Sequence, residues 1–98
     1  MLGQRINELR TSFGWSQVDL ARHLGVAKQT VSNWENDNIQ PSIEMLIRIA
    51  KQFNVTTDYL LGLDSVPRIS TEDLPIDFVA HLVLLIEDYK KKESNEPK

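Results

Sequence analysis

The sequence contains no cysteine among its 98 residues. This absence excludes a disulfide framework, a thiolate nucleophile and a zinc site built on thiolates, and it is compatible with a reducing compartment. A long apolar segment is also missing. The longest apolar stretch spans residues 78–86, far short of the roughly 20 residues that cross a bilayer. The chain start lacks the basic and then apolar pattern of a secretory signal. We therefore expect a cytoplasmic protein with no membrane segment.

The signatures of common enzyme sites are absent as well. No Gly-x-Ser-x-Gly elbow, no Gly-x-x-x-x-Gly-Lys phosphate loop and no Gly-x-Gly-x-x-Gly fingerprint occurs in the sequence. The two histidines, His23 and His81, are 58 positions apart and have no neighbouring metal-ligand spacing. A chain of this length forms one small domain with little room for a deep active site. We predict a binding protein that is not an enzyme and uses neither a metal nor a cofactor.

A basic excess is missing too, since 14 acidic side chains outnumber 11 basic ones and the net charge is −3. Proteins that bind nucleic acid non-specifically usually carry a positive balance, which releases counterions from the polyanion. The charge is unevenly divided along the chain. Residues 1–34 carry four basic and two acidic side chains, whereas residues 35–98 carry seven basic and twelve acidic ones. The acidic excess therefore lies in the later part of the chain.

The pattern that is present is helical throughout. Hydrophobic residues recur every three or four positions, and no run of four or more alternates cleanly between apolar and polar, so a sheet is not expected. We predict an all-α fold whose first part contains five short helices, at residues 2–13, 16–24, 28–35, 42–53 and 56–61. The fourth of these would turn five apolar residues inward, namely Ile43, Leu46, Ile47, Ala50 and Phe53.

The domain organisation follows from a change in composition after Gly62. Turn-forming residues dominate the next stretch, and Pro75 suits the first position of a further helix. We expect a helical domain at 1–62, a linker at 63–74, a C-terminal helix at 75–92 and a frayed tail at 93–98.

The C-terminal helix is apolar on two stripes, one formed by Ile76, Val79, Val83 and Ile86 and the other by Phe78, Leu82, Leu85 and Tyr89. A helix on the surface of a monomer would bury one stripe and leave the other exposed to solvent. We predict a homodimer in which one stripe packs on the parent domain or linker and the other on the partner. The expected dimer contacts are Val79, Leu82, Val83, Leu85, Ile86 and Tyr89. The arrangement left open is a helix that folds back and is wholly absorbed by its own domain.

The most informative stretch is residues 17–36, where Ala21, Gly25 and Val31 have the spacing that a helix-turn-helix needs. Ala21 is small enough for two helices to cross closely, and Gly25 can adopt the positive φ of a tight turn. On the segment after the turn, the inward positions are Ala27, Val31 and Trp34. The outward positions are Lys28, Gln29, Ser32, Asn33 and Asn36, whose side chains are of the types that pair with base edges in a major groove.

The chain resembles the phage-repressor (Xre-type) helix-turn-helix family over residues 2–62. The resemblance rests on Ser-Gln-x-x-Leu-Ala at 16–21, Gly25-Val26, Val31-Ser32-x-Trp34-Glu35-Asn36, Pro41-Ser42 and Asp58-Tyr59-Leu60-Leu61-Gly62. It implies a five-helix, lambda-repressor-like DNA-binding domain, to which this chain adds its C-terminal helix.

The resemblance also implies a role for particular residues. The positions that read bases are Lys28, Gln29, Ser32 and Asn33, and those that contact the DNA backbone are Ser16, Gln17, Asn36, Gln40 and Ser42. Arg10 and Glu35 match a pair that joins the first helix to the end of the recognition helix, which is the predicted helix at 28–35.

Two features depart from the family pattern. The residues after Asn36 are Asp37-Asn38-Ile39-Gln40, where relatives usually have glycine and basic residues, so phosphate clamping by this loop is not expected. Ala27 stands where a helix usually has an oxygen-bearing N-cap, and its amides remain available for a phosphate or water.

The functional prediction is a sequence-specific regulator of transcription that binds double-stranded DNA, a dimeric repressor reading a pseudo-palindromic operator through the major groove. The alternative is a protein-interaction module on the same scaffold, such as an antitoxin or anti-repressor. The expected partners are double-stranded DNA, a second copy of the chain and, for the alternative, a regulatory protein. No segment resembles a small-molecule ligand domain.

Overall fold

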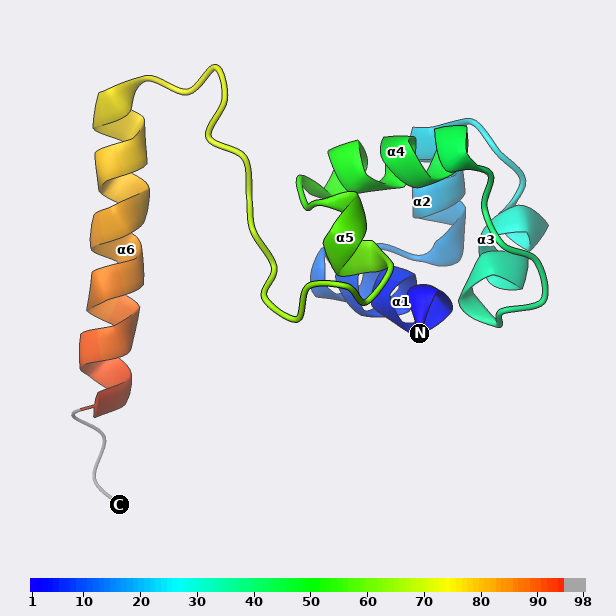
Figure 1. The fold of residues 1–98 in the computed structure, drawn as a ribbon, viewed down its shortest axis with the longest axis horizontal. Coiled ribbons are helices and arrows are strands. Elements are labelled where there is room, and N and C mark those ends of the chain that lie inside the picture. Colours follow the sequence, from blue (N-terminus) through cyan, green and yellow to red (C-terminus); the bar gives the residue numbers. More distant parts are fainter. Residues whose placement is uncertain (95–98) are drawn as a thin grey trace.

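The computed structural model describes residues 1–94 and is all-helical over that range, which confirms the predicted fold class. Its helices are α1 (Leu2–Ser12), α2 (Gln17–Leu24), α3 (Lys28–Glu35), α4 (Ile43–Phe53), α5 (Thr57–Leu60) and α6 (Ile76–Ser94). Helices α1–α5 form one body, and α6 stands beside it at the end of a long connection (Figure 1). The frayed tail predicted at 93–98 begins within α6, and residues 95–98 lie outside the described part of the chain.

Local side-chain chemistry sets the ends of the short helices. The Ser16 hydroxyl accepts a hydrogen bond from the Asp19 amide, and the Asp19 carboxylate accepts one from the Ser16 amide, so α2 begins with a full capping box. These hydrogen bonds hold the pKa of Asp19 below its ordinary value. The Ser42 hydroxyl accepts a hydrogen bond from the Met45 amide and caps α4 without a reciprocal hydrogen bond, and the Thr56 hydroxyl caps α5 through the Tyr59 amide.

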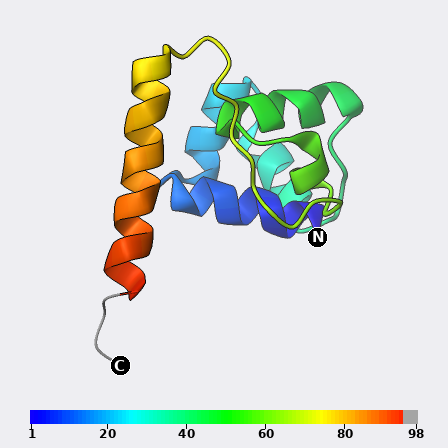
Figure 2. The ribbon, with the colours of Figure 1, turned by 60° about the vertical axis from the view of Figure 1, so that its left-hand side comes forward.

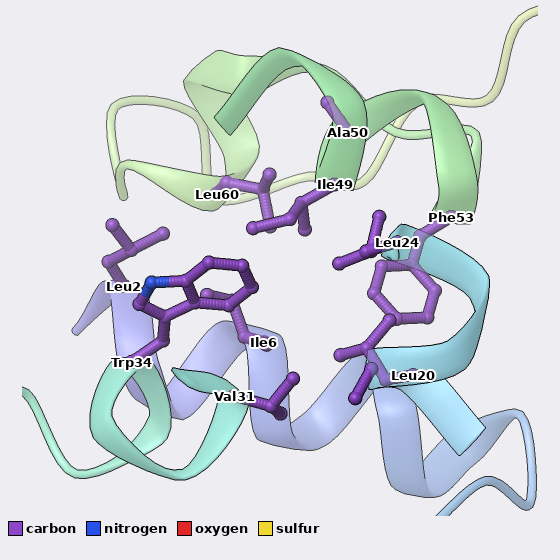
Figure 3. Close-up of a cluster of buried hydrophobic side chains, with 11 residues drawn as sticks. Leu2, Ile6, Leu20, Leu24, Val31, Trp34, Ile49, Ala50, Phe53 and Leu60 are labelled. Carbon is purple, nitrogen blue, oxygen red and sulfur yellow. The ribbon is translucent and has the colours of Figure 1, made fainter. Parts of the chain in front are cut away.

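The core lies where α1, α2, α3 and α4 meet, with Leu60 of α5 closing one side (Figure 3). Its central side chains, including Ile6, Leu20, Val31 and Ile49, have no exposed surface. Trp34 reaches from α3 toward Leu2 and Ile6 of α1 and is a core residue, as its inward spacing predicts. Val31 and Trp34 thereby pack α3 on the rest of the domain, whereas Ala27, which the helical period also predicted to face inward, is exposed because it precedes the first turn of α3.

The predicted inner face of α4 is wrong at two positions. Ile43 is 79% exposed and Ile47 is 42% exposed, whereas Ala50 and Phe53 are buried as expected. At about 100° per residue, the two isoleucines lie roughly a quarter turn or more from the centre of the buried arc. The other helices cover only that centre, so the apolar stripe in the sequence is broader than the buried surface it encounters.

The linker and α6 leave the helical body. Residues 61–75 follow an irregular path, and the Asn54 side chain donates a hydrogen bond to the Ser70 carbonyl on the way. A turned view shows α6 running past one side of the domain (Figure 2). Over residues 1–94 no helix combines the length and the apolar character that crossing a bilayer requires.

Both apolar stripes of α6 remain open in this structure. Val79 and Leu82 are half-buried, but the other six members of the two stripes are exposed, from Phe78 at 47% to Ile76 at 82%. The helix is therefore not absorbed by its own domain. Helix-to-helix packing within residues 1–94 is concentrated among α1–α5, and a contact of one stripe with the parent domain or linker stays a prediction.

Candidate nucleic-acid interface

The turn between α2 and α3 fixes the direction of α3. Gly25 ends α2 in the left-handed conformation, with φ of 70°, and the Val26 amide donates back to the Ala21 carbonyl at 3.0 Å. From α4, the Arg48 guanidinium donates to the Leu24 carbonyl at 2.8 Å and so satisfies the end of α2 just before the turn. Sequence reasoning missed this role of Arg48, because nothing local links it to a helix 24 residues earlier.

The recognition face, defined here as Lys28, Gln29, Ser32 and Asn33, lies on the side of α3 opposite the core. Lys28 and Gln29 are exposed, whereas Ser32 and Asn33 are half-buried. The Gln29 amide donates to the Asn33 carbonyl oxygen at 3.1 Å. The side chain of Lys28 makes no hydrogen bond or ion pair with any other residue in the range 1–94. The structure therefore brings the four residues together on one accessible surface.

The start of α3 carries no side-chain cap. Ala27 precedes the helix in extended conformation, and no side chain accepts a hydrogen bond from the first turn. The amides of that turn point out of the helix N-terminus, where the helix dipole favours an anion. With Lys28 as the first helical residue, this end of α3 is the most electropositive part of the recognition face.

Glu35 is the centre of a polar network at the other end of α3. Its carboxylate accepts from Arg10 through Nε at 2.6 Å and Nη2 at 3.0 Å, from Asn7 at 2.9 Å and from Gln17 at 3.1 Å. Its side chain is only 3% exposed. The structure thus brings together the two residues of the expected ion pair and adds Asn7 and Gln17 to them.

The protonation states in this network follow from its hydrogen bonds. Burial by itself raises the pKa of Glu35, but the hydrogen bonds from Arg10, Asn7 and Gln17 outweigh burial and hold that pKa below its ordinary value. The hydrogen bond to Glu35 raises the pKa of Arg10 in turn. Both groups are charged at neutral pH, so α1, the start of α2 and the end of α3 are joined by a charge-assisted clamp.

The expected backbone-contacting residues occupy two helix starts and one loop. Ser16 and Ser42 accept the capping hydrogen bonds of α2 and α4, and each hydroxyl keeps its own proton to donate. Gln17 uses one amide proton on Glu35 and keeps the second. Asn36 and Gln40 are exposed on the α3–α4 loop.

The loop acid Asp37 turns toward α1. It has a positive φ of 58°, and its carboxylate accepts a hydrogen bond from the Gly3 amide at 3.2 Å. Gly3 is itself required there, because a Cβ at this position would collide with the Trp34 carbonyl oxygen. An isolated glycine inside a helical pattern is the signal that could have revealed this close approach. No comparable signal marks Asn7, which the sequence shows only as a polar residue on the outer face.

Comparisons with known proteins agree with this geometry. A helix-turn-helix family model matches residues 6–60. The transcriptional regulator ImmR of Bacillus subtilis is 37% identical over 73 residues, which are 74% of this chain and 58% of ImmR. The chain thus spans less than two thirds of the length of that relative.

Two solved structures have a similar fold. The P22 c2 repressor bound to a synthetic operator matches 65% of this chain and 97% of its own, with a TM-score of 0.62 and 31% identity. A SinR–SinI complex contains a chain that matches 98% of this chain and 100% of its own, with a TM-score of 0.60 and 26% identity. The second match extends beyond the five-helix body to α6.

Proposed function

The chain belongs to the helix-turn-helix family, and from that premise we propose that it is a sequence-specific transcriptional regulator that binds double-stranded DNA. The observation that carries the proposal is the recognition face, four hydrogen-bonding side chains on the outer surface of α3. The last residue of that helix, Glu35, is held by Arg10, and the turn before the helix is held by the hydrogen bond from Arg48 to the Leu24 carbonyl. Proteins similar to this chain support the proposal, since ImmR is a transcriptional regulator and the structure of the P22 c2 repressor was solved in complex with an operator.

Base reading is assigned to the recognition face. Lys28 donates to the O6 and N7 acceptors of guanine, and Gln29 and Asn33 carry amides that pair with base edges. Ser32 is short, so it reaches a base only if α3 lies deep in the groove. The close packing of α3 on α1 through Trp34 keeps these four side chains in one register.

Backbone contacts are assigned to Ser16, Gln17, Asn36, Gln40 and Ser42. Three of them, Ser16, Gln17 and Ser42, stand at the starts of α2 and α4, where free amides and the helix dipole attract a phosphate. The α3–α4 loop contributes no Lys or Arg, and its Asp37 is directed at Gly3. We therefore expect phosphate binding by neutral donors, with weak binding to non-operator DNA.

The functional unit is proposed to be a homodimer that acts as a repressor. The open stripes of α6, with Val79, Leu82, Val83, Leu85, Ile86 and Tyr89, supply an apolar contact surface. Two recognition helices about 34 Å apart would read a pseudo-palindrome with half-sites one helical turn apart. Doubling the contacts offsets the low positive charge of each domain.

The test is selection of random duplex DNA by the purified full chain at several salt concentrations. We expect an enriched pseudo-palindrome, with affinity that falls less steeply with salt than for a basic DNA-binding domain, because few cations meet phosphates. Absence of an enriched sequence at low salt would overturn the proposed function. Enrichment of a single half-site without symmetry would overturn the dimeric part alone.

A further inference from the structure

One of the two apolar stripes of α6 has the spacing of a coiled-coil seam. Its members follow one another at intervals of four, three and four residues, the alternation that keeps a seam directed at one partner helix. We call this set the α6 seam, which consists of Phe78, Leu82, Leu85 and Tyr89. Leu82 is half-buried and the other three are exposed. Because α6 stands apart from the helical body (Figure 1), a second helix can reach the seam along its length.

The two flanks of the α6 seam differ in character. One flank carries His81 and Asp88, and both side chains are exposed. Neither of them makes a hydrogen bond or an ion pair with another residue in the range 1–94. An imidazole can donate a hydrogen bond and a carboxylate accepts one, but the rise of about 10 Å between these two positions keeps them apart on one helix. The other flank is apolar and carries Val79 and Ile86.

Two copies of α6 can pair through the seam in either of two directions. In an antiparallel pair, the flank of His81 meets the same flank of the second copy. His81 then lies beside the second copy's Asp88, and the twofold axis repeats this contact. The flanks that carry Val79 and Ile86 also meet each other, so apolar surface is buried on the other side of the seam.

A parallel pair would bring like charges together. In that direction each seam residue faces its own equivalent, and Lys92, which continues the spacing of the seam, would face the second copy's Lys92. Asp88 would lie beside the second copy's Glu93, because a parallel pair joins residues of opposite flanks. Like charges at facing positions oppose association, so the charges of α6 favour the antiparallel direction.

We propose that the α6 helices of two chains pair in antiparallel orientation through the seam, with His81 of each chain beside Asp88 of the other. The proposal rests on the proposed homodimer and specifies how its two copies meet. Ile76 lies level with the second copy's Lys91, so the starts of the two helices are about 22 Å apart along the pair. A parallel pair would hold them within about 10 Å. The antiparallel direction sends the two linkers to opposite ends and suits recognition helices about 34 Å apart.

Disulfide crosslinking tests the direction, because each cysteine variant of a chain without cysteine carries a single thiol. In the antiparallel pair Phe78 packs beside the second copy's Tyr89. The two copies of residue 78 are about 16 Å apart, beyond the Cα separation of roughly 7 Å that a disulfide spans. The full-length variants Phe78→Cys and Tyr89→Cys are oxidised alone and as an equimolar mixture. We expect a covalent dimer of mixed mass from the mixture and almost none from either variant alone.

The outcomes separate the direction of pairing from the dimer itself. Covalent dimers from each variant alone, without the mixed product, would overturn the antiparallel direction and leave the homodimer in place. Absence of every crosslink in variants that sediment as dimers would exclude the α6 seam as the contact. A wild type that remains a monomer in sedimentation equilibrium would instead overturn the proposed homodimer on which the pairing rests.

A charge variant tests the polar flank and leaves the seam unaltered. His81→Lys places a full positive charge beside the second copy's Asp88 at two symmetric sites, and we expect the dissociation constant of the dimer to fall about threefold at pH 7. Ala80→Lys is the matched control, because it adds the same charge on the exposed side of α6 opposite the seam and should leave that constant unchanged. Sedimentation equilibrium measures both. Equal changes in the two variants, or weaker association of His81→Lys, would overturn the pairing of residue 81 with Asp88.

Discussion

The guanidinium of Arg10 and the carboxylate of Glu35 are joined by two nearly parallel donors, and this pair connects α1 to the last residue of the recognition helix. The same guanidinium donates to the Trp15 carbonyl at 2.7 Å, at the entry to α2. One side chain therefore sets the positions of three elements. Gln17 also donates a hydrogen bond to Glu35. The same carboxylate therefore holds both the end of α3 and Gln17, a proposed phosphate contact.

Replacing Glu35 by alanine is expected to destabilise the domain by about 3 kcal/mol, because it leaves the Arg10 charge nearly buried without its partner. Urea denaturation followed by circular dichroism measures the loss. Arg68→Ala is the matched control, since Arg68 pairs with Asp64 on the exposed linker and its removal is expected to leave the unfolding midpoint unchanged. Equal effects of the two substitutions would contradict the assigned importance of the buried pair.

Stability is expected to fall in acid through the same carboxylate. The pKa of Glu35 is lower in the folded chain than its ordinary value of 4.5, so its contribution is fully present above that pH. As the pH falls below 4.5 and through the folded pKa, protonation of Glu35 removes the contribution. Urea unfolding from pH 7 to pH 3 should show a smaller acid loss for Glu35→Gln than for the wild type. Identical slopes would show that other carboxylates govern acid unfolding.

Gly3→Ala is expected to destabilise the domain by roughly 1–3 kcal/mol, the usual cost of inserting a carbon into a close-packed contact. The new Cβ would meet the Trp34 carbonyl, and α1 would have to move away from the end of α3. Gln4→Ala, on the exposed side of the same helical turn, is the control and should remain within about 0.5 kcal/mol of the wild type. A thermal unfolding midpoint unchanged by Gly3→Ala would contradict the close approach.

The proposed dimer contact is tested by Leu85→Asp, which places a charge on one apolar stripe of α6. We expect a monomer in sedimentation equilibrium, with the helical signal of α1–α5 retained because α6 does not cover their core. Leu84→Asp is the matched control, because Leu84 is 61% exposed, similar to Leu85 at 66%, but belongs to neither stripe. Dimer mass retained by Leu85→Asp, or lost equally in both variants, would exclude these stripes as the contact.

Much of the helical body could be predicted because its signals are local. The positive φ of Gly25, the cap at Ser16 and the burial of Trp34 all follow from residue type and spacing within one or two helical turns. The failures concern relations between elements. Periodicity marked Ile43 and Ile47 as apolar but could not indicate that no helix covers them, and the position of α6 depends on a linker without a regular pattern.

In the candidate site, too, local features could be predicted and relations between side chains could not. The identity of the outward residues on α3 follows from the helical period, whereas the hydrogen bonds among them depend on rotamers that spacing alone does not specify. The contribution of Asn7 to the Glu35 network depends on the crossing of α1 and α3, which brings together residues 28 positions apart. A single sequence therefore indicates which residues face outward but not how they share their donors.

The separation of α6 from the core makes folding and association two independent equilibria. The five-helix body closes its core without α6, so we expect a folded monomer at chain concentrations below the dissociation constant of the proposed dimer. In a protein that reads a palindrome as a dimer joined through such a helix, occupancy of the operator rises with the square of the monomer concentration in that range. The exposed helix would then set a concentration threshold for control, and small changes in synthesis or degradation of the chain would be amplified at the promoter.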